Sequence, residues 1–325
     1  MSRVQIIMRT FERPVLLARA LASVQRQTFG DWHLVVVNNG GRPGPVDSVV
    51  AASGIGAQKV TVLHLDARTG MEDASNRGLS SARADFFAIH DDDDAWHEDF
   101  LAVTVARLDS APSAAGVVTG LTKVHETMKN GRVWPVREEP FWLNPGRLTF
   151  RGMIGANTFP PVAALFRRSV LDMVGMFDAS LPVLGDWEFN LRAVRAGGFL
   201  FEPRVLARYH VRTPESDRAS ANSIVDGESL HRSVKLLLQD RWLGETVDGV
   251  NKGVLSVQAQ AAGDIEDLRI AGVKSHFDVD IEAIAARSAY LTVSTISQRR
   301  VVRRLARGLR HPGHALRAIR RIVAG

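Results

Sequence analysis

The sequence predicts an α/β protein with a mixed, mostly parallel sheet flanked by helices, followed by a helical C-terminal extension. Two observations carry this prediction. The first half of the chain alternates short apolar runs with helical patterns, which is typical of βαβ units. Polar clusters, Asn38-Asn39 and Asp91–Asp94, directly follow two of the apolar runs. Functional groups of open α/β sheets gather at the carboxyl ends of strands.

The first half contains four apolar runs that predict strands. They are Val4–Met8, Leu34–Val37, Val60–Leu65 and Phe86–His90. Pro14 suits the first turn of a helix, because Leu17, Leu21 and Val24 then recur at helical spacing. Residues 71–82 predict another helix, and a loop rich in Gly and Pro is expected after Gly41.

The second half mixes further strands and helices. Strands are predicted at Val117–Leu121, Val133–Val136 and Ala163–Arg167, and helices near Ser169–Val174 and at Asp186–Arg195. Asn130-Gly131 marks a hairpin turn between the first two of these strands, and Gly197-Gly198 ends the second helix. Beyond about Pro214 the pattern is helical and less compact.

Composition and charge exclude several classes of function. The 325 residues include no cysteine, which rules out a disulfide framework, a Cys-ligated metal and a thiolate nucleophile. Lys and Arg number 41 against 35 Asp and Glu, but the last 43 residues hold ten Arg and no acid, leaving 31 basic against 35 acidic in residues 1–282. Because the excess sits in one tail, we do not expect a nucleic-acid partner.

The N-terminal residues lack a long apolar segment, and no stretch approaches the ~20 apolar residues of a membrane-spanning helix. We therefore expect a cytoplasmic protein. The Arg-rich tail suggests a peripheral position at the inner face of the membrane, because Arg299–Leu309 predicts an amphipathic helix that suits anionic lipid. Its apolar stripe equally suits packing on the rest of the chain or on another subunit.

The aspartate run Asp91–Asp94 is electrostatically costly, because neighbouring like charges raise one another's pKa. A cationic partner is therefore expected nearby. A hard divalent metal, Mn²⁺ or Mg²⁺, suits carboxylate oxygens, and such ions are usually shared with substrate phosphates. An acidic turn or a helix N-terminus is the alternative, since both favour Asp. The run by itself leaves both interpretations open.

Several ordered motifs between residues 3 and 212 resemble family 2 glycosyltransferases of the GT-A type. Residues 91–96, D-D-D-D-A-W, are similar to the family's D-x-D-D-x-W segment. Residues 6–14 and 21–40 resemble its opening, and residues 74–79, A-S-N-R-G-L, resemble its A-R-N-x-G helix. Residues 166–169, 174–178 and 185–192 resemble its F-R-R-S, G-G-F-D and E-D-x-E-L-x-L-R segments.

The resemblance implies a GT-A, Rossmann-like fold and metal-dependent, inverting transfer of a sugar from a nucleotide-sugar donor. It implies a glycosyltransferase domain at residues 1–215, with a nucleotide-sugar half (1–120) and an acceptor half (121–215), and an extension at 216–325. The acceptor would be a glycan or a lipid-linked molecule in bacterial surface polysaccharide assembly. The donor would be a UDP-, dTDP- or GDP-sugar.

Individual roles follow from the same resemblance. Asp186 matches the general base, with an N-cap as the alternative and Glu188 in reserve. Asp93 would bind the metal, together with Asp91 and, if it is a ligand and not simply hydrogen-bonded in place, His210. Asp91 and Asp92 would also hold ribose, sugar or metal-bound water. The further nucleotide-sugar contacts would be Thr10, Phe11, Glu12, Asn38, Asn39, Asn76 and Arg77.

Five positions depart from the family pattern. Asn38-Asn39 replaces Asp-Asp, Ser75 replaces the Arg of A-R-N, and Gly185 replaces the acid before the base. Arg9 stands where relatives carry Pro or a small polar residue. The departures at Asn38, Asn39, Ser75 and Gly185 support a second hypothesis, a catalytically inactive GT-A relative that binds a nucleotide or glycan. A nucleotidyltransferase ranks third, because the chain lacks an N-terminal Gly-rich, basic phosphate loop.

Overall fold

The computed structural model describes residues 2–141, 148–212, 228–242, 244–247 and 250–270. The chain divides into two compact units, Met1–Leu238 and Gln239–Gly325. The predicted boundary between residues 215 and 216 lies outside the described residues, and so does the Arg-rich segment at residues 299–309. Each unit is described by itself below.

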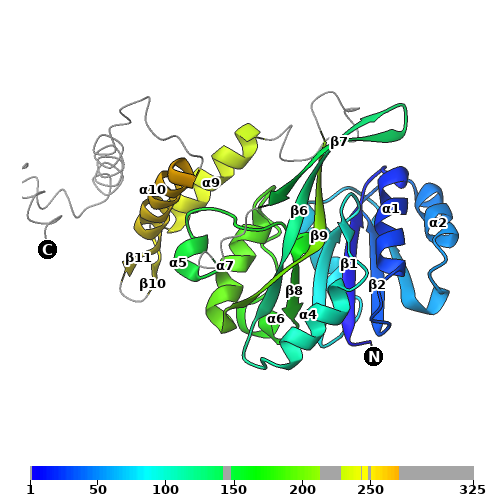
Figure 1. The fold of residues 1–325 in the computed structure, drawn as a ribbon, viewed down its shortest axis with the longest axis horizontal. Helices are drawn as coiled ribbons and strands as arrows, with labels where there is room; N and C mark the ends of the chain where they lie inside the picture. Colours follow the sequence, from blue (N-terminus) through cyan, green and yellow to red (C-terminus); the bar gives the residue numbers. More distant parts are fainter. Residues whose placement is uncertain (1, 142–147, 213–227, 243, 248–249, 271–325) are drawn as a thin grey trace, which may run out of the picture. The chain divides into compact units, whose positions relative to one another are not determined.

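Among the described residues of the first unit, nine strands form one mixed sheet in the order β3-β2-β1-β4-β8-β6-β9-β5, with β7 paired to β6 (Figure 1). The first-half strands are β1 (Val4–Thr10), β2 (Trp32–Asn38), β3 (Val60–His64), β4 (Phe86–Asp91) and the short β5 (Ala95–Trp96). β1 pairs in parallel with both β2 and β4, and β2 pairs in parallel with β3. The four strands predicted from apolar runs are confirmed.

The core of this half lies along β1, β2 and β4, whose apolar side chains are almost fully buried. Strands buried on both faces read as continuous apolar runs, which is why the sequence predicts them well. The helices around them are α1 (Pro14–Gln25), α2 (Pro43–Ala52), α3 (Met71–Ser80) and α4 (Phe100–Asp109). In Figure 1, α1 and α2 lie side by side next to β1 and β2.

Helix α2 corrects the expectation of a Gly- and Pro-rich loop. Pro43 occupies the first turn, where its missing N–H is not needed, and Arg42 precedes it in an extended conformation. Val46 and Val50, one turn apart, are both buried. The helix therefore forms because its apolar stripe packs, although Pro43, Gly44 and Pro45 are poor helix formers in isolation.

The remaining strands of the sheet are β6 (Gly116–Lys129), β7 (Arg132–Phe141), β8 (Ala164–Arg167) and β9 (Phe199–Arg212). β8 runs antiparallel to β4 and β6, whereas the long β9 runs parallel to β6 and antiparallel to β5. The predicted hairpin is confirmed: Asn130 and Gly131 both have positive φ, 51° and 70°, as a type I′ turn requires.

The helices of this half are α5 (Phe150–Met153), α6 (Ser169–Val174) and α7 (Gly185–Gly197), with 3₁₀ turns at Ala57–Lys59 (η1) and Pro161–Ala163 (η3). Helix α7 ends at Gly198, whose φ of 68° favours glycine. At its other end, Leu184 is in the left-handed region with φ of 65° and provides no side-chain cap. A non-glycine residue in this conformation is uncommon.

Helix α9 (Glu228–Trp242) crosses from the first unit into the second. The second unit also contains the strand pair β10 (Thr246–Val247) and β11 (Val250–Asn251), and α10 (Lys252–Ile270). Within this unit, Lys252 Nζ lies 2.8 Å from Glu245 Oε2. Among all described helices, none is both long enough and apolar enough to cross a bilayer.

Candidate active site

The two polar clusters that follow strands lie at one edge of the sheet. In the parallel register, Thr10 at the end of β1 pairs with Asn38 on β2, and Arg9 pairs with Asp91 on β4. The carboxyl ends of β1, β2 and β4 therefore meet, as the sequence predicts. Asp91 is the last residue of β4, and the chain then turns, with the Asp94 N–H donating to the Asp91 carbonyl over 3.3 Å.

The aspartate run has cationic partners, as expected, and they are arginines. Asp92, Asp93 and Asp94 are buried, whereas the Asp91 side chain is 28% exposed. Arg13 Nη2 lies 2.5 Å from Asp92 Oδ1, and Arg13 Nη1 lies 3.3 Å from Asp93 Oδ2. The same Asp93 oxygen accepts from Arg212, whose side chain is fully buried.

These contacts set the charge of the run. Burial alone would raise the pKa of Asp93, but the Arg13 and Arg212 guanidinium groups lower it to about 2. Burial raises the pKa of Asp92 to about 6 against the opposing effect of Arg13. Asp93 is therefore the ionised centre of the run, and Asp92 titrates nearer neutrality.

A buried glutamate completes this arginine network. Glu126 on β6 accepts from Arg19 Nη1 over 2.6 Å and from Arg212 Nη1 over 3.1 Å. Arg19 Nη2 also donates to the Asp93 carbonyl. The sequence does not predict the roles of Arg13, Arg19 and Glu126. Arg13 lies in the motif at residues 6–14, but Arg19 and Glu126 lie in none, and the three come together only when α1, β6 and β9 pack.

His210 lies beside the run. The backbone N–H of His210 donates to Asp94 Oδ1 over 2.8 Å, and the ring Nδ1 lies 3.9 Å from the same oxygen. Its side chain is 6% exposed, and burial lowers its pKa to about 3. The imidazole is therefore neutral at physiological pH.

The donor set fits a divalent cation in its chemistry. Within the described ranges, no group of three or more His, Asp and Glu side chains converges on one point that could hold a metal alone. Asp93 supplies an ionised carboxylate and His210 a neutral imidazole, two ligand types that suit Mn²⁺. A cation at Asp93 would compete with Arg13 and Arg212, which already contact this carboxylate.

Asp186 lies in the first turn of α7. Its Oδ2 accepts from Asn157 Nδ2 over 2.6 Å, and its carboxylate also accepts the Trp187 N–H. Burial raises the pKa of Asp186 against these hydrogen bonds, with Arg9 lowering it and Asp91 raising it. The alternative that Asp186 is an N-cap is wrong, because Leu184 occupies that position.

Arg9 joins the aspartate run to a second carboxylate. Its Nε donates to Asp91 Oδ1 over 2.9 Å, and its Nη1 lies 3.3 Å from Glu72 Oε2 and 3.2 Å from Ser75 Oγ. Glu72 is 3% exposed and also accepts the Gly185 N–H. Burial raises the pKa of Glu72 to about 7. Sequence analysis missed Glu72.

The two asparagines hold the loops around them. Asn38 Nδ2 donates to the Gly41 carbonyl over 2.7 Å, and its Oδ1 accepts the Gly41 N–H. Asn39 makes three hydrogen bonds to Thr69: it donates to the carbonyl over 2.9 Å and accepts from the N–H over 2.8 Å and from Oγ1 over 3.0 Å. Both side chains are buried.

The other residues predicted to contact the nucleotide-sugar lie at the end of β1, just after it, and on α3. Thr10 is buried at the end of β1, whereas Glu12 accepts the Arg42 N–H over 2.7 Å. The Phe11 ring lies under the Arg68 guanidinium, 4.2 Å from ring centroid to Cζ. Asn76 donates to the Phe177 carbonyl over 2.9 Å and accepts its N–H over 3.1 Å. The side chain of Arg77 is 54% exposed and pairs with Asp73.

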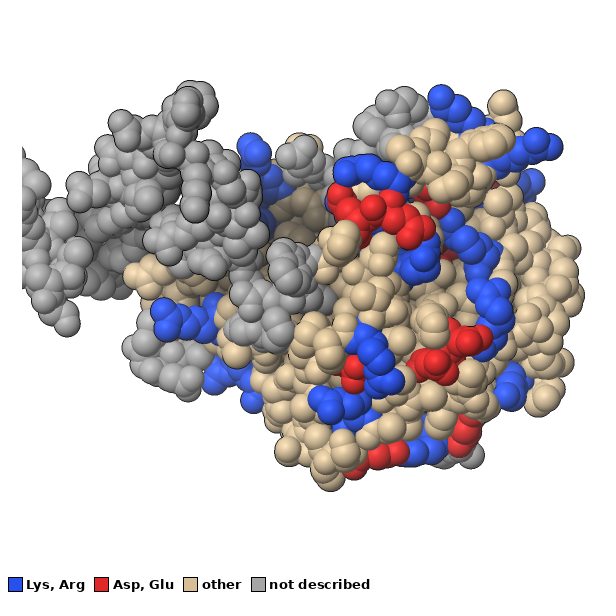
Figure 2. Space-filling view, in the orientation of Figure 1, with Lys and Arg blue, Asp and Glu red and all other residues tan. Residues whose placement is uncertain are grey.

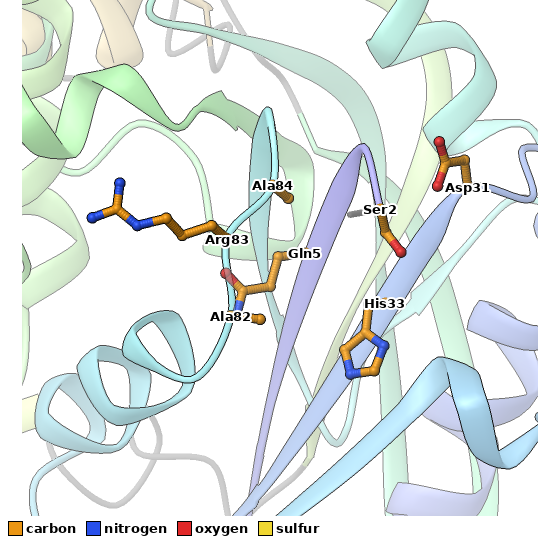
Figure 3. A pocket seen from close by; sticks show the side chains of 7 residues that line it. All are labelled: Ser2, Gln5, Asp31, His33, Ala82, Arg83 and Ala84. Atoms are coloured by element: carbon orange, nitrogen blue, oxygen red, sulfur yellow. The ribbon is translucent and has the colours of Figure 1, made fainter.

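A pocket of about 620 Å³ lies at the other edge of the sheet (Figure 3). It is lined by Ser2, Gln5, Asp31, His33, Ala82, Arg83 and Ala84, near the amino ends of β1, β2 and β4. Gln5 already accepts from Arg168, and His33 Nε2 lies 2.9 Å from Thr61 Oγ1. None of the predicted site residues lines this pocket.

Charges of both signs share the surface. On the face of the first unit in Figure 2, Asp and Glu side chains lie directly beside Lys and Arg. This mixing agrees with the net charge of −4 that the sequence gives residues 1–282.

Comparison with known sequences gives one consistent family. The sequence model described as Glycosyl transferase family 2 matches residues 5–175. The Bacillus subtilis protein named uncharacterized glycosyltransferase YwdF is 28% identical over 197 residues, 59% of this chain and 68% of its own. The Mycobacterium bovis BCG PGL/p-HBAD biosynthesis glycosyltransferase is 29% identical over 231 residues, 70% of this chain and 82% of its own.

Solved structures show the same fold at low sequence identity. Residues 1–349 of Staphylococcus aureus TarS in complex with UDP-GlcNAc match 90% of this chain and 81% of theirs, with a TM-score of 0.58 and 16% identity. The mannosyltransferase PcManGT from Pyrobaculum calidifontis, in complex with GDP-Man and Mn²⁺, matches 90% of this chain and 81% of its own, with a TM-score of 0.55 and 17% identity. The chain spans 49% of the longer TarS structure. The fold is that of GT-A glycosyltransferases.

Proposed function

Because this chain belongs to glycosyl transferase family 2, whose sequence model covers more than half of it, we propose that it transfers a sugar from a nucleoside-diphosphate sugar to a hydroxyl group. The acceptor is a glycan or a lipid-linked molecule of bacterial surface polysaccharide assembly. Two fold relatives support the donor class, since one is bound to UDP-GlcNAc and the other to GDP-Man.

The observation that carries this proposal is the convergence of Asp186 with the aspartate run. Arg9 hydrogen-bonds Asp91, and both groups act on the pKa of Asp186, although α7 begins about ninety residues after β4. This relationship supports Asp186 as the base beside carboxylates that suit a diphosphate-bound cation. Asp186 is also partly exposed, so that a substrate hydroxyl can reach it.

In the proposed reaction, the Asp186 carboxylate accepts the proton of the acceptor hydroxyl. The acceptor oxygen then forms a bond to the anomeric carbon, while the bond between that carbon and the diphosphate oxygen breaks. The electron pair of the broken bond leaves with the nucleoside diphosphate. This single displacement inverts the anomeric configuration. Asn157 orients the base through its hydrogen bond to Oδ2.

Mn²⁺ or Mg²⁺, held by Asp93 with His210 and Asp91, would neutralise negative charge on the diphosphate leaving group. Arg13 and Arg212 surround the same carboxylate and add positive charge there. Asp92 holds ribose or the sugar in this proposal. Thr10, Phe11 and Glu12 line the nucleotide at the end of β1, while Asn76 and Arg77 on α3 lie further along its path.

The nucleobase is assigned to the loop that begins at Asn38 and Asn39. An amide side chain can both accept and donate, so Asn39 suits uracil or thymine and does not demand an acidic partner. In this structure its amide is bonded to Thr69, on the loop before α3. Base binding by Asn39 would therefore require that loop to rearrange.

The departures from the family pattern do not favour the inactive-binder hypothesis in this structure. The Arg9 guanidinium contacts Ser75, where relatives carry an arginine. The Glu72 carboxylate fills the space beside Gly185, where relatives carry an acid. A positive group, from Arg9, is thus present near Ser75, and a negative group, from Glu72, is present near Gly185.

The deciding experiment measures hydrolysis and transfer with a panel of UDP-, dTDP- and GDP-sugars in Mn²⁺, for wild type and Asp93→Ala. We expect turnover in wild type, loss in Asp93→Ala, and loss in wild type treated with EDTA that Mn²⁺ restores. Nucleotide binding without turnover across the whole panel would support the inactive binder. Turnover unaffected by EDTA would contradict the metal assignment.

A further inference from the structure

We propose that Glu72 is a positioning residue of the transfer site, whose carboxylate caps helix α7 from another element and so fixes Asp186. This inference rests on the proposed function, because it concerns the base of that reaction. Glu72 has no role in the mechanism above, yet it is 3% exposed and lies in the first turn of α3. A carboxylate buried at this cost requires partners.

The first partner is the start of α7. Glu72 accepts the Gly185 N–H, one of the N-terminal amide groups that a helix leaves without an internal acceptor. The residue in the cap position, Leu184, has an apolar side chain and makes no cap hydrogen bond. Glu72 therefore supplies from α3 an acceptor for the first amide of α7, at an end that has no capping side chain of its own.

The fit between Glu72 and Gly185 leaves no room for a side chain. A Cβ atom at Gly185 would lie 2.4 Å from both Cγ and Oε1 of Glu72, and 2.5 Å from its carboxyl carbon. The last separation equals that between Cβ and the carboxyl carbon within a glutamate itself. A glutamate at position 185 could therefore place its carboxyl group where that of Glu72 now lies.

The second partner is Arg9. Its Nη1 lies 3.3 Å from Glu72 Oε2, and its Nε and Nη2 donate to Asp91. One buried carboxylate thus connects the turn that carries the base with the strand end that begins the aspartate run. Asp186 follows Gly185 directly, so a shift of the Gly185 amide moves the base relative to Asp91.

Removal of the carboxylate should therefore impair catalysis more than donor binding. We expect Glu72→Ala to lower kcat about 10- to 100-fold with a smaller change in the KM of the donor, because small misplacements of a catalytic group cost this much. Glu72→Gln keeps an oxygen that can accept the Gly185 N–H and should lose less. Faster hydrogen exchange at the Gly185 amide in Glu72→Ala would report the lost cap independently of turnover.

The sharpest test relocates the carboxylate. Gly185→Glu alone should be less active and should melt at a lower temperature, because the new side chain and that of Glu72 would compete for the same space. Glu72→Ala combined with Gly185→Glu should recover most of the kcat that Glu72→Ala loses and melt above Gly185→Glu. A double variant that shows the summed losses of both single variants would overturn the proposal.

Glu202→Ala is the matched control, since Glu202 is also a buried glutamate paired with arginines, Arg204 and Arg107, but on β9. We expect it to lower the melting temperature without the loss of kcat. If wild type turns over no donor, the proposed function fails by itself. The exchange rate of the Gly185 amide and the melting temperatures of the four variants then decide the role of Glu72.

Discussion

Asn157 Nδ2 lies 2.6 Å from Asp186 Oδ2, a hydrogen bond between residues 29 positions apart. The bond lowers the pKa of Asp186, which burial raises. It also fixes the orientation of the carboxylate through Oδ2. Asn157 therefore influences both the geometry and the protonation of the proposed base.

Replacing Asn157 should move the pH profile of transfer. The proposed base acts when ionised, so activity rises as pH passes its pKa. Asn157→Ala removes a hydrogen bond to the ionised form and raises that pKa further. We expect the acidic limb of kcat against pH to move to higher pH. An unchanged limb would show that Asn157 does not act on the base.

Asp186→Asn should remove the base while keeping the shape of the site. We expect kcat to fall about 10²- to 10⁴-fold, the usual contribution of general base catalysis. UDP or GDP binding, measured by calorimetry, should remain within a few-fold of wild type. If Asp186→Asn keeps most of the sugar-transfer activity, another group must be the base, and Glu188 is the first candidate.

Glu72 should make the chain less stable as pH rises. Its pKa is about 7 in the folded chain against an ordinary value of 4.5, so the folded chain holds the proton more tightly. Stability then falls between about pH 4.5 and 7, by at most roughly 3 kcal/mol. Arg9, Asp91 and Asp186 face the same carboxylate and set this shift.

We expect urea midpoints of Glu72→Gln to fall less steeply than those of wild type between pH 5 and 7. The glutamine keeps the shape but cannot ionise. Equal slopes for the two proteins would show that the Glu72 pKa is ordinary.

Arg212→Leu should destabilise the first unit strongly. The Arg212 side chain is fully buried, with 0% of its surface exposed, and it contacts Asp93 and Glu126. Its removal leaves buried carboxylates short of a partner, at about 3 kcal/mol. Arg3→Ala is the control, because Arg3 pairs with Asp85 and Asp109 at the surface and should cost at most about 1 kcal/mol. Equal unfolding midpoints of the two variants would contradict this ranking.

The Arg-rich tail should bind anionic membranes. Each basic side chain near such a surface contributes about 1 kcal/mol, and the sequence holds ten Arg and no acid after Glu282. We expect the full chain to sediment with vesicles that contain phosphatidylglycerol, and the chain ended at Gln298 to remain in the supernatant. Equal partition of both would favour packing of the tail on protein.

Buried strands and local turns could be predicted from the sequence because their signals are local. β1 and β2 contain the apolar runs Ile6–Met8 and Leu34–Val37, and Asn130-Gly131 is a two-residue hairpin signal. Helix α2 could not be predicted in this way, since packing of Val46 and Val50 outweighs the poor propensity of its first residues. Local rules fail where tertiary burial decides.

The candidate site was only partly predictable for the same reason. Asp91–Asp94 and Asp186 stand in recognisable motifs. The cationic partner that we expected for the run was a divalent metal, whereas the contacts that the structure shows come from Arg13 and Arg212. Glu72 and Asn157 lie on other elements, and no spacing links them to Asp186. Such partners become visible only in three dimensions.

The alternation of side chains along strand β9 decides which residues face the site. Val124 pairs with His210 and Glu126 with Arg212, so both polar side chains point the same way, while Tyr209 and Val211 alternate with them. A one-residue insertion before Tyr209 would exchange these two sets, whereas a two-residue insertion would preserve their facing. The register shifts in the pairing of β6 with β9 lie at Thr119–Leu121, before these pairs. The regular alternation from Val124 to Glu126 therefore keeps His210 and Arg212 on one face, where the His210 backbone meets an aspartate 116 residues earlier in the chain.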